Sequence, residues 1–246
     1  MKAIYNKYRI LRIRPRLHYT WFFAVILITI AVVTQFSPVY PLSHRVYAGL
    51  GASVLFFIAV NVREFTLSFV ATRKGIVAES VTLFAFGGLS NIDRDTSTPV
   101  LEFLLATLGA LLNITIAGIF SVVYFVLMQR GGILVDVLVQ WLAFIWFMLA
   151  LFHLIPGFPL DGGRALRALL WKLTGDYERA TRIASWVGWG IGLLLTIGGI
   201  ILLVITQEWF TGVFLIAIGL VLQNAATHSR RQIRPRTVTN TQPSDS

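Results

Sequence analysis

The sequence has no cysteine among its 246 residues. Disulfide bonds and thiolate metal sites are therefore excluded, and cysteine usage gives no information on the redox compartment. Charged residues are scarce as well, at 13%, against about 25% in ordinary soluble domains. Acidic residues are the rarer sign, with 11 Asp and Glu against 21 Lys and Arg. So little charge cannot cover the surface of a soluble domain, which indicates a protein that lies in a lipid bilayer.

Hydrophobic residues make up 56% of the chain and are gathered in long apolar runs. A transmembrane helix needs about 20 mostly apolar residues. The expected spans are six in number, the last being the shortest: Tyr19–Phe36, Tyr47–Ala71, Val100–Met128, Ile133–Ile155, Ile183–Ile205 and Trp209–Gln223. The sequence therefore predicts a polytopic α-helical membrane protein with about six transmembrane helices.

The net charge of +10 is distributed around these spans. With the N-terminus inside, 18 of the 21 Lys and Arg residues fall in predicted cytoplasmic segments and two fall outside. This bias predicts that both termini are cytoplasmic, in the inner (plasma) membrane of a bacterium or archaeon. No nucleic-acid-binding motif accompanies the basic clusters, so the expected partner is the lipid bilayer and no nucleic acid is expected.

The chain is predicted to have three parts. Residues 1–18 form a basic cytoplasmic N-terminus, residues 19–228 the transmembrane domain, and residues 229–246 a polar, disordered cytoplasmic tail. Within the domain, Val81–Ser90 is β-branched and aromatic and contains Gly87-Gly88, which predicts a small β-strand element. Because lipid satisfies no backbone groups, we expect this membrane-associated strand to pair or to lie against protein.

The segment Pro156–Arg164 reads Pro-Gly-Phe-Pro-Leu-Asp-Gly-Gly-Arg. Its prolines and glycines end a helix and place Asp161 where the backbone is irregular. Such backbone at membrane depth is tolerated only within protein or beside a water-filled cavity, so Asp161 is a candidate site residue. The alternative is a turn in which Asp161 caps a helix that begins near Gly162. The residues that follow, with Arg164 and Arg167 among apolar ones, predict a helix at the cytoplasmic interface.

Two charged residues, Arg63 and Glu64, interrupt the second apolar run. A charge inside a span costs about 2.5–3.5 kcal/mol on insertion scales. Neighbours on a helix point about 100° apart, so we expect each charge to find its partner in another segment. The alternative is a span that ends near Val62, with both charges at the interface.

The segment Leu154–Arg164 resembles the third-ligand motif of the site-2 proteases, a family of intramembrane zinc metalloproteases. Three other segments resemble the family in the right order: the helix around Glu64, the strand at Val81–Ser90, and Leu108–Asn113. The resemblance covers roughly Ile10 to His228. It implies that Glu64 stands at the general-base position of a zinc-binding H-E-x-x-H helix, that Asp161 stands at the third-ligand position, and that Asn113 corresponds to the Asn of the family's third core helix.

The departures from the family pattern concern the metal. Arg63 and Leu67 stand where that helix has its two histidines, and neither side chain binds a metal. A catalytic zinc needs about three protein ligands. The roles of Glu64 and Asp161 are therefore predicted to be vestigial, with no cofactor. His153 replaces an Asn of the family motif; it is interpreted as a hydrogen-bonded core histidine, with zinc binding as the alternative.

The favoured function is a catalytically inactive pseudoprotease that binds transmembrane helices, such as those of single-span membrane proteins, or another membrane partner. One alternative is an active zinc metalloprotease with non-standard ligands, and another is a small transporter or channel. A further hypothesis is that Arg63 fills the space of the metal and forms an ion pair with Asp161. The sequence does not indicate an oligomeric state.

Overall fold

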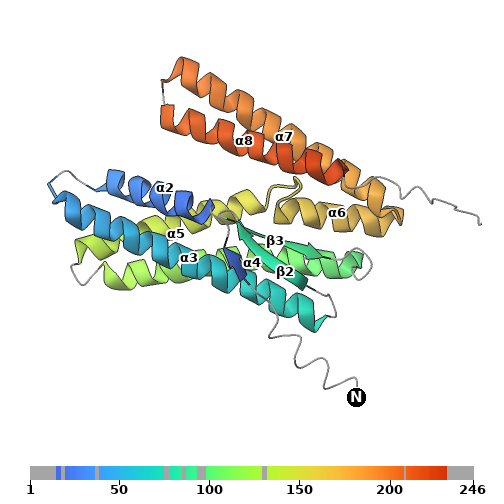
Figure 1. The fold of residues 1–246 in the computed structure, drawn as a ribbon, viewed down its shortest axis with the longest axis horizontal. Helices are drawn as coiled ribbons and strands as arrows, with labels where there is room; N and C mark the ends of the chain where they lie inside the picture. The colour runs from blue at the N-terminus through green and yellow to red at the C-terminus, as the bar shows by residue number, and fades with distance from the viewer. Residues whose placement is uncertain are drawn as a thin grey trace, which may run out of the picture. The chain divides into compact units, whose positions relative to one another are not determined.

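The computed structural model describes residues 15–17, 20–36, 39–74, 78–84, 87–92, 98–128, 132–207 and 209–231. The chain divides into two compact units, Met1–Ile155 and Pro156–Ser246. Each unit contains helices that run alongside one another (Figure 1). The tail expected to be disordered, apart from its first residues, lies outside the described residues.

The first unit is built on four helices, α2 (Thr20–Gln35), α3 (Leu42–Arg73), α4 (Pro99–Leu127) and α5 (Ile133–His153). Apolar side chains from three of them meet in one buried cluster: Ala59, Val60, Ile116, Ala117 and Trp146. This cluster lies about one helical turn from Arg63 on α3 and from Asn113 on α4. The packing of these helices therefore sets the position of the polar residues.

A small sheet of three strands completes the first unit: β1 (Pro15–Leu17), β2 (Ala78–Phe84) and β3 (Gly87–Ile92). The order is β1-β2-β3. The β1 strand pairs with β2 in parallel, with Arg16 opposite Thr82. The β2 strand pairs with β3 in antiparallel fashion, with Thr82 opposite Leu89. The two later strands follow α3 directly, so the sheet continues from the end of the helix that carries Arg63 and Glu64.

The second unit contains α6 (Asp161–Thr174), α7 (Tyr177–Ile205) and α8 (Trp209–Arg231). The last two are antiparallel and approach closely, because glycines face backbone across the interface. A Cβ atom added at Gly192 would lie 2.7 Å from the carbonyl oxygen of Gly219. Gly175, with φ of 70°, ends α6 in the left-handed conformation, and Asp176 caps α7 by accepting from the backbone of Glu178.

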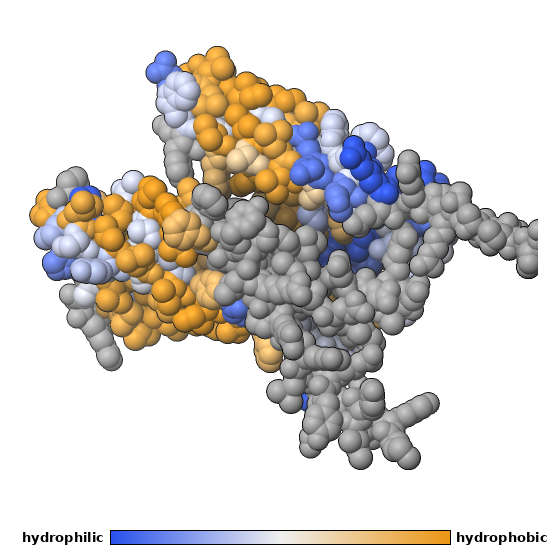
Figure 2. Space-filling model, in the orientation of Figure 1, coloured by the Kyte–Doolittle hydropathy of each residue, from blue (hydrophilic) through white to orange (hydrophobic). Residues whose placement is uncertain are grey.

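Among the described residues, five helices are long and apolar enough to cross a membrane: α3, α4, α5, α7 and α8. The remaining expected span, Tyr19–Phe36, corresponds to α2, whose 16 residues rise about 24 Å. Many large apolar side chains on these helices are exposed, such as Leu194 at 70% and Val204 at 74%. Figure 2 shows this hydrophobic surface along the helices. Such a surface needs a bilayer to cover it, so this is an integral membrane protein of several apolar helices.

The helix boundaries differ most from those expected in two places. The last span was predicted to be short, ending at Gln223, whereas α8 continues to Arg231. The polar residues Asn224–Arg230 extend the helix because hydropathy alone sets the limit of an apolar run, while backbone hydrogen bonding continues through polar side chains. Similarly, α7 begins at Tyr177, six residues before its apolar run, where Asp176 caps it.

Candidate functional site

The two charges of the second span lie on a continuous helix. The α3 helix runs from Leu42 to Arg73, and its 32 residues rise about 48 Å. Arg63 and Glu64 are each only 6% exposed. The helix therefore continues past Val62, and the alternative of a membrane boundary near Val62 stays a prediction. Both charges belong to the interior of the first unit, and Leu67, one turn further on, is half-buried.

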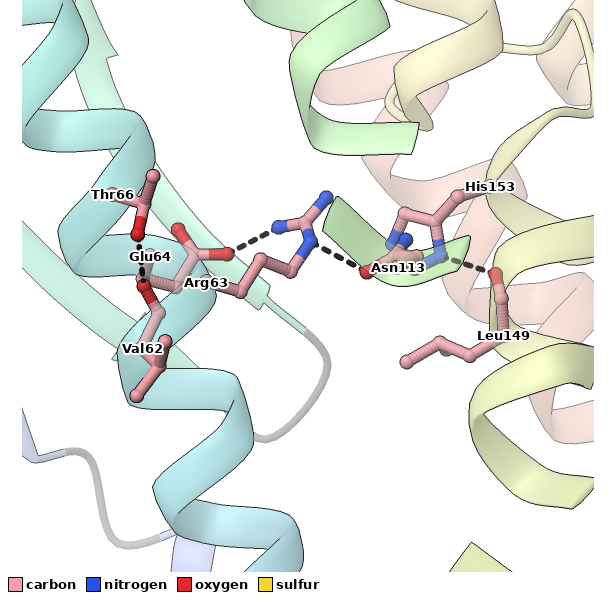
Figure 3. A network of polar contacts seen from close by, with 7 residues as sticks. All are labelled: Val62, Arg63, Glu64, Thr66, Asn113, Leu149 and His153. Atoms are coloured by element: carbon pink, nitrogen blue, oxygen red, sulfur yellow. Dashed lines mark hydrogen bonds and ion pairs between the residues drawn. The ribbon is translucent and has the colours of Figure 1, made fainter. Parts of the chain in front are cut away.

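Arg63 forms an ion pair with its neighbour Glu64 through Nη1 and Oε1. Its Nε atom also donates a hydrogen bond of 2.7 Å to Oδ1 of Asn113 on α4. Figure 3 shows the guanidinium between these two acceptors. The expectation that each charge finds its partner in another segment was wrong in part, because Arg63 and Glu64 also pair with each other. The 100° separation applies to the Cβ directions, whereas the long arginine side chain bends back far enough to reach the carboxylate.

Asn113 is fully buried, at 0% exposure. Its Oδ1 accepts from Arg63, and its Nδ2 has no hydrogen-bond partner within the described residues. Burying an unpaired polar atom is unfavourable, so the amide is retained for the bond that it does make. The bond links α3 to α4 through a charge-assisted contact, which is stronger than one between neutral groups.

His153 is the last residue of α5 and is 9% exposed. Its Nδ1 atom lies 2.9 Å from the carbonyl oxygen of Leu149, one turn earlier on the same helix (Figure 3). A carbonyl only accepts, so this contact requires the proton on Nδ1. The imidazole is thus oriented by its own helix.

Asp161 lies in the second unit, at the start of α6, and is 6% exposed. Leu160 occupies the N-cap position, so Asp161 is the first helical residue and does not precede the helix. A carboxylate in the first turn is favourable because the helix dipole places positive charge there. The predicted ion pair between Asp161 and Arg63 joins the two units and stays a prediction.

The loop that leads to Asp161 is fixed by tight backbone packing. The backbone N–H of Phe158 donates to the carbonyl of Ala184 on α7. A Cβ atom added at Gly188 would lie 2.1 Å from the Phe158 carbonyl oxygen, and one at Gly163 would lie 2.1 Å from the Phe158 nitrogen. Only glycine fits at either position. Gly163 and Gly188 therefore allow the loop to lie directly against α6 and α7.

Arg167 holds the same loop from the other side. Its guanidinium carbon lies 4.6 Å from the ring centre of Phe158 and 5.2 Å from that of Tyr177. Both distances are typical of cation–π contacts. From the sequence, Arg167 was expected on an interfacial helix. A positioning role was not predictable, because its ring partners are nine residues before it and ten after it.

Sequence reasoning also missed Glu102, which is 4% exposed on the first turn of α4. An acidic residue soon after Thr98-Pro99 is typical of a helix N-terminus at the surface. Only the packing of α4 against α3, with Ala71 and Leu105 in one cluster, reveals that this carboxylate is buried. The sequence carried no signal of that burial.

The side chains at this site do not fit a zinc ion. Where the resemblance predicts the two zinc-binding histidines, Arg63 has a guanidinium bonded to Glu64 and Asn113, and Leu67 has an alkyl side chain. Within the described part of either unit, no three His, Asp or Glu side chains are grouped as a metal site requires. The arrangement neutralises a buried carboxylate with an internal cation.

Three comparisons with known proteins agree on the kind of molecule. Residues 128–196 match the model of peptidase family M50. The protein sll0528 of Synechocystis, provisionally named a zinc metalloprotease, is 36% identical over 187 residues, which are 74% of this chain and 48% of that protein. Rip3 of Mycobacterium tuberculosis, with the same provisional name, is 35% identical over 149 residues, which are 60% of this chain and 38% of that protein.

A solved structure shares the fold. The site-2 protease from Methanocaldococcus jannaschii matches with a TM-score of 0.63 at 24% sequence identity, over 92% of this chain and 95% of that chain. The two sequence relatives are longer, and this chain spans half of their length or less.

The helices, the buried Glu64 on α3 and the Pro-Gly-Phe-Pro-Leu-Asp-Gly-Gly loop define a protease-like integral membrane protein. The chain belongs to the site-2 protease family. The family resemblance inferred from the sequence is confirmed.

Proposed function

We propose that this chain is a non-catalytic member of the site-2 protease family, which binds transmembrane helices of other membrane proteins without cutting them. The observation that carries the proposal is the buried guanidinium of Arg63, which stands at a zinc-ligand position and bonds to Glu64 and Asn113. A permanent cation repels a metal ion, and a guanidinium has no lone pair to offer one.

The state of Glu64 supports the same conclusion. A general base in a metalloprotease takes a proton from a water molecule that a metal activates. Here the Glu64 carboxylate is held by its neighbour in a buried setting, where charge-assisted bonds are strong. Leu67 supplies no metal ligand either. A metal that would activate the water therefore lacks two of its expected protein ligands, at positions 63 and 67.

The proposed topology has six spans, with α2 as the first, both termini in the cytoplasm and the small sheet at the membrane surface. The location is the inner (plasma) membrane of a bacterium or archaeon. A reporter active only outside the cytoplasm tests this arrangement. Signal is expected from fusions in residues 38–45 and 130–132, and signal from a fusion within residues 75–98 would contradict it.

The names of sll0528 and Rip3 favour a rival function, which is zinc-dependent cleavage with unusual ligands. A cleavage assay separates the two. The full chain is reconstituted in nanodiscs with a labelled single-span peptide, and products are read by mass spectrometry beside an active site-2 protease. We expect energy transfer between peptide and protein without products, and no change for Glu64→Gln. Zinc-dependent products that vanish in Glu64→Gln would establish the rival.

A constructive variant tests whether the scaffold retains the geometry of the metal site. Arg63→His with Leu67→His restores two histidines one helical turn apart. The double variant is expected to bind zinc together with Asp161, measured by isothermal titration in detergent. Arg63→His alone is the control and is expected to bind far more weakly. Failure of the double variant would show that α3 and the Asp161 loop do not converge on one point.

A further inference from the structure

One end of the second unit is densely basic. The α7 helix starts and α8 ends at the same end of their antiparallel pair, and α6 packs against α7 (Figure 1). Seven cations gather on these segments: Arg164, Arg167, Lys172, Arg179, Arg182, Arg230 and Arg231. Figure 2 shows the hydrophilic surface at this end beside the hydrophobic surface of α7 and α8.

The acidic residues at this end do not balance the charge. Among the described residues of the second unit, the acidic ones are Asp161, Asp176 and Glu178. Asp161 is buried, and Asp176 is engaged in capping α7. In the described part of the chain, Arg182 and Arg231 are exposed and form no ion pair.

Within this basic end, Arg230 and Trp186 form a specific pair. The Arg230 guanidinium carbon lies 4.1 Å from the ring centre of Trp186, which is 55% exposed. Its Nη2 donates to Oγ1 of Thr227 at 3.3 Å. Its Nε is inaccessible to water and has no acceptor among the described residues. The guanidinium is thus held by an aromatic ring and one hydroxyl, with a donor left unused.

Arg182 lies one helical turn before Trp186 on α7, and Arg231 follows Arg230 on α8. The first guanidinium is therefore on the same face of α7 as the tryptophan. Apolar side chains continue from Trp186 toward the hydrophobic part of the pair, with Val187 36% exposed and Val221 59% exposed. Cations, an amphipathic ring and an apolar surface follow one another along the helices.

We propose that Arg182, Trp186, Arg230 and Arg231 form a binding site for the headgroup of an anionic phospholipid. Guanidinium groups bind phosphate oxygens through paired hydrogen bonds, and tryptophan prefers the boundary between headgroups and acyl chains. The acyl chains lie along the exposed apolar residues of α7 and α8. Continuity with this surface favours a lipid over a nucleic acid or an acidic protein, because those partners leave the apolar part uncovered.

The experiment uses the full chain in detergent micelles. Phosphatidylglycerol or phosphatidylcholine is added, and native mass spectrometry counts bound lipid while the thermal midpoint is followed by tryptophan fluorescence. The wild type is expected to retain phosphatidylglycerol and to gain stability, with much weaker effects of phosphatidylcholine. Arg182→Gln with Arg230→Gln is expected to weaken phosphatidylglycerol binding about 30-fold, since each basic side chain contributes about fivefold near an anionic headgroup.

Two controls separate a site from general attraction. Arg45→Gln with Arg73→Gln removes the same charge from α3 and is expected to leave phosphatidylglycerol binding unchanged. Arg182→Lys with Arg230→Lys keeps the charge but loses the planar fork, and is expected to give an intermediate loss. Equal binding of the two lipids by the wild type would overturn the proposal, even if a variant fails to fold. An equal loss in the α3 control, or binding of an acidic peptide in preference to lipid, would also overturn it.

Discussion

The proposed vestigial site has two halves, one on α3 and one in the loop before α6, and they are held in place in different ways. On α3, a cation and a leucine stand where the family resemblance predicts two histidines, and Arg63 is bonded to Glu64 and Asn113. In the loop before α6, the sequence from Pro156 to Arg164 retains the family-like pattern, and its glycines lie against backbone. The α3 half is held by side-chain bonds, while the loop half is fixed by its backbone.

The difference follows from how each half is built. A side chain on a straight helix is replaced without moving the helix, provided that a buried charge finds a partner. The loop at Gly157–Leu160 has no such freedom, because neighbouring atoms leave no space for a Cβ atom at Gly163 or Gly188. The proposed absence of zinc ligands on α3 is therefore compatible with a tightly packed loop before α6.

The largest expected effect comes from Arg63→Leu, which breaks the α3 half. It strands the buried carboxylate of Glu64 and removes the bond to Asn113. Breaking a buried pair from one side costs about 3–5 kcal/mol. We expect a loss of that size in the free energy of unfolding, measured by denaturant titration in detergent micelles.

The matched variants for Arg63→Leu are Arg63→Lys, and Arg63→Leu with Glu64→Gln. Lysine keeps the charge without the fork, so the loss should be smaller, and the neutral double variant should recover part of it. If Arg63→Leu unfolds like the wild type, the guanidinium does not stabilise the site. Recovery by Asp161→Asn instead of Glu64→Gln would support the predicted Arg63–Asp161 pair.

A second prediction concerns the backbone half. In Gly188→Ala the new methyl group would lie 2.1 Å from the Phe158 carbonyl oxygen. We expect a destabilisation of about 1–3 kcal/mol from overpacking. Gly190→Ala, two residues on, meets nothing within 4 Å, and alanine's better helix propensity should stabilise it by up to about 1 kcal/mol. Thermal midpoints that move in the same direction would refute the difference between the two glycines.

The smallest expected effect is that of Arg167→Gln, which loosens the loop without a clash. Two cation–π contacts, to Phe158 and Tyr177, are lost. Together they contribute about 1–2 kcal/mol. The variant should show faster amide hydrogen exchange at Phe158 and Leu160, with Arg164→Gln as the unaffected control. Unchanged exchange at both residues would mean that Arg167 does not hold the loop.

Much of the fold was predictable, because a long apolar run forms an α-helix in a bilayer. The spans around Val100–Met128 and Ile133–Ile155 match α4 and α5 within two residues at each end. The end of α8 was not predictable from hydropathy, since its last two turns are polar. The site residues were identified by motif, and their burial follows from packing that sequence spacing does not encode.

The partners of Arg63 show the limit most clearly. The sequence indicated a buried cation in need of an acceptor, and helix geometry favoured an acceptor from another segment. The structure pairs it with that neighbour and adds Asn113, which lies 50 residues away in sequence. A long side chain reaches one acceptor or another depending on its rotamer and on how closely α4 approaches. The spacing of residues in the sequence determines neither of these.

The central claim is that an internal cation has replaced the metal, and the metal content of the purified chain tests it most directly. The protein is expressed with ample zinc, purified without chelators, and analysed by inductively coupled plasma mass spectrometry beside an active site-2 protease. We predict zinc at the level of the buffer blank in the wild type and in Glu64→Gln alike. Zinc near one ion per chain, lost in Glu64→Gln or Asp161→Asn, would contradict the account.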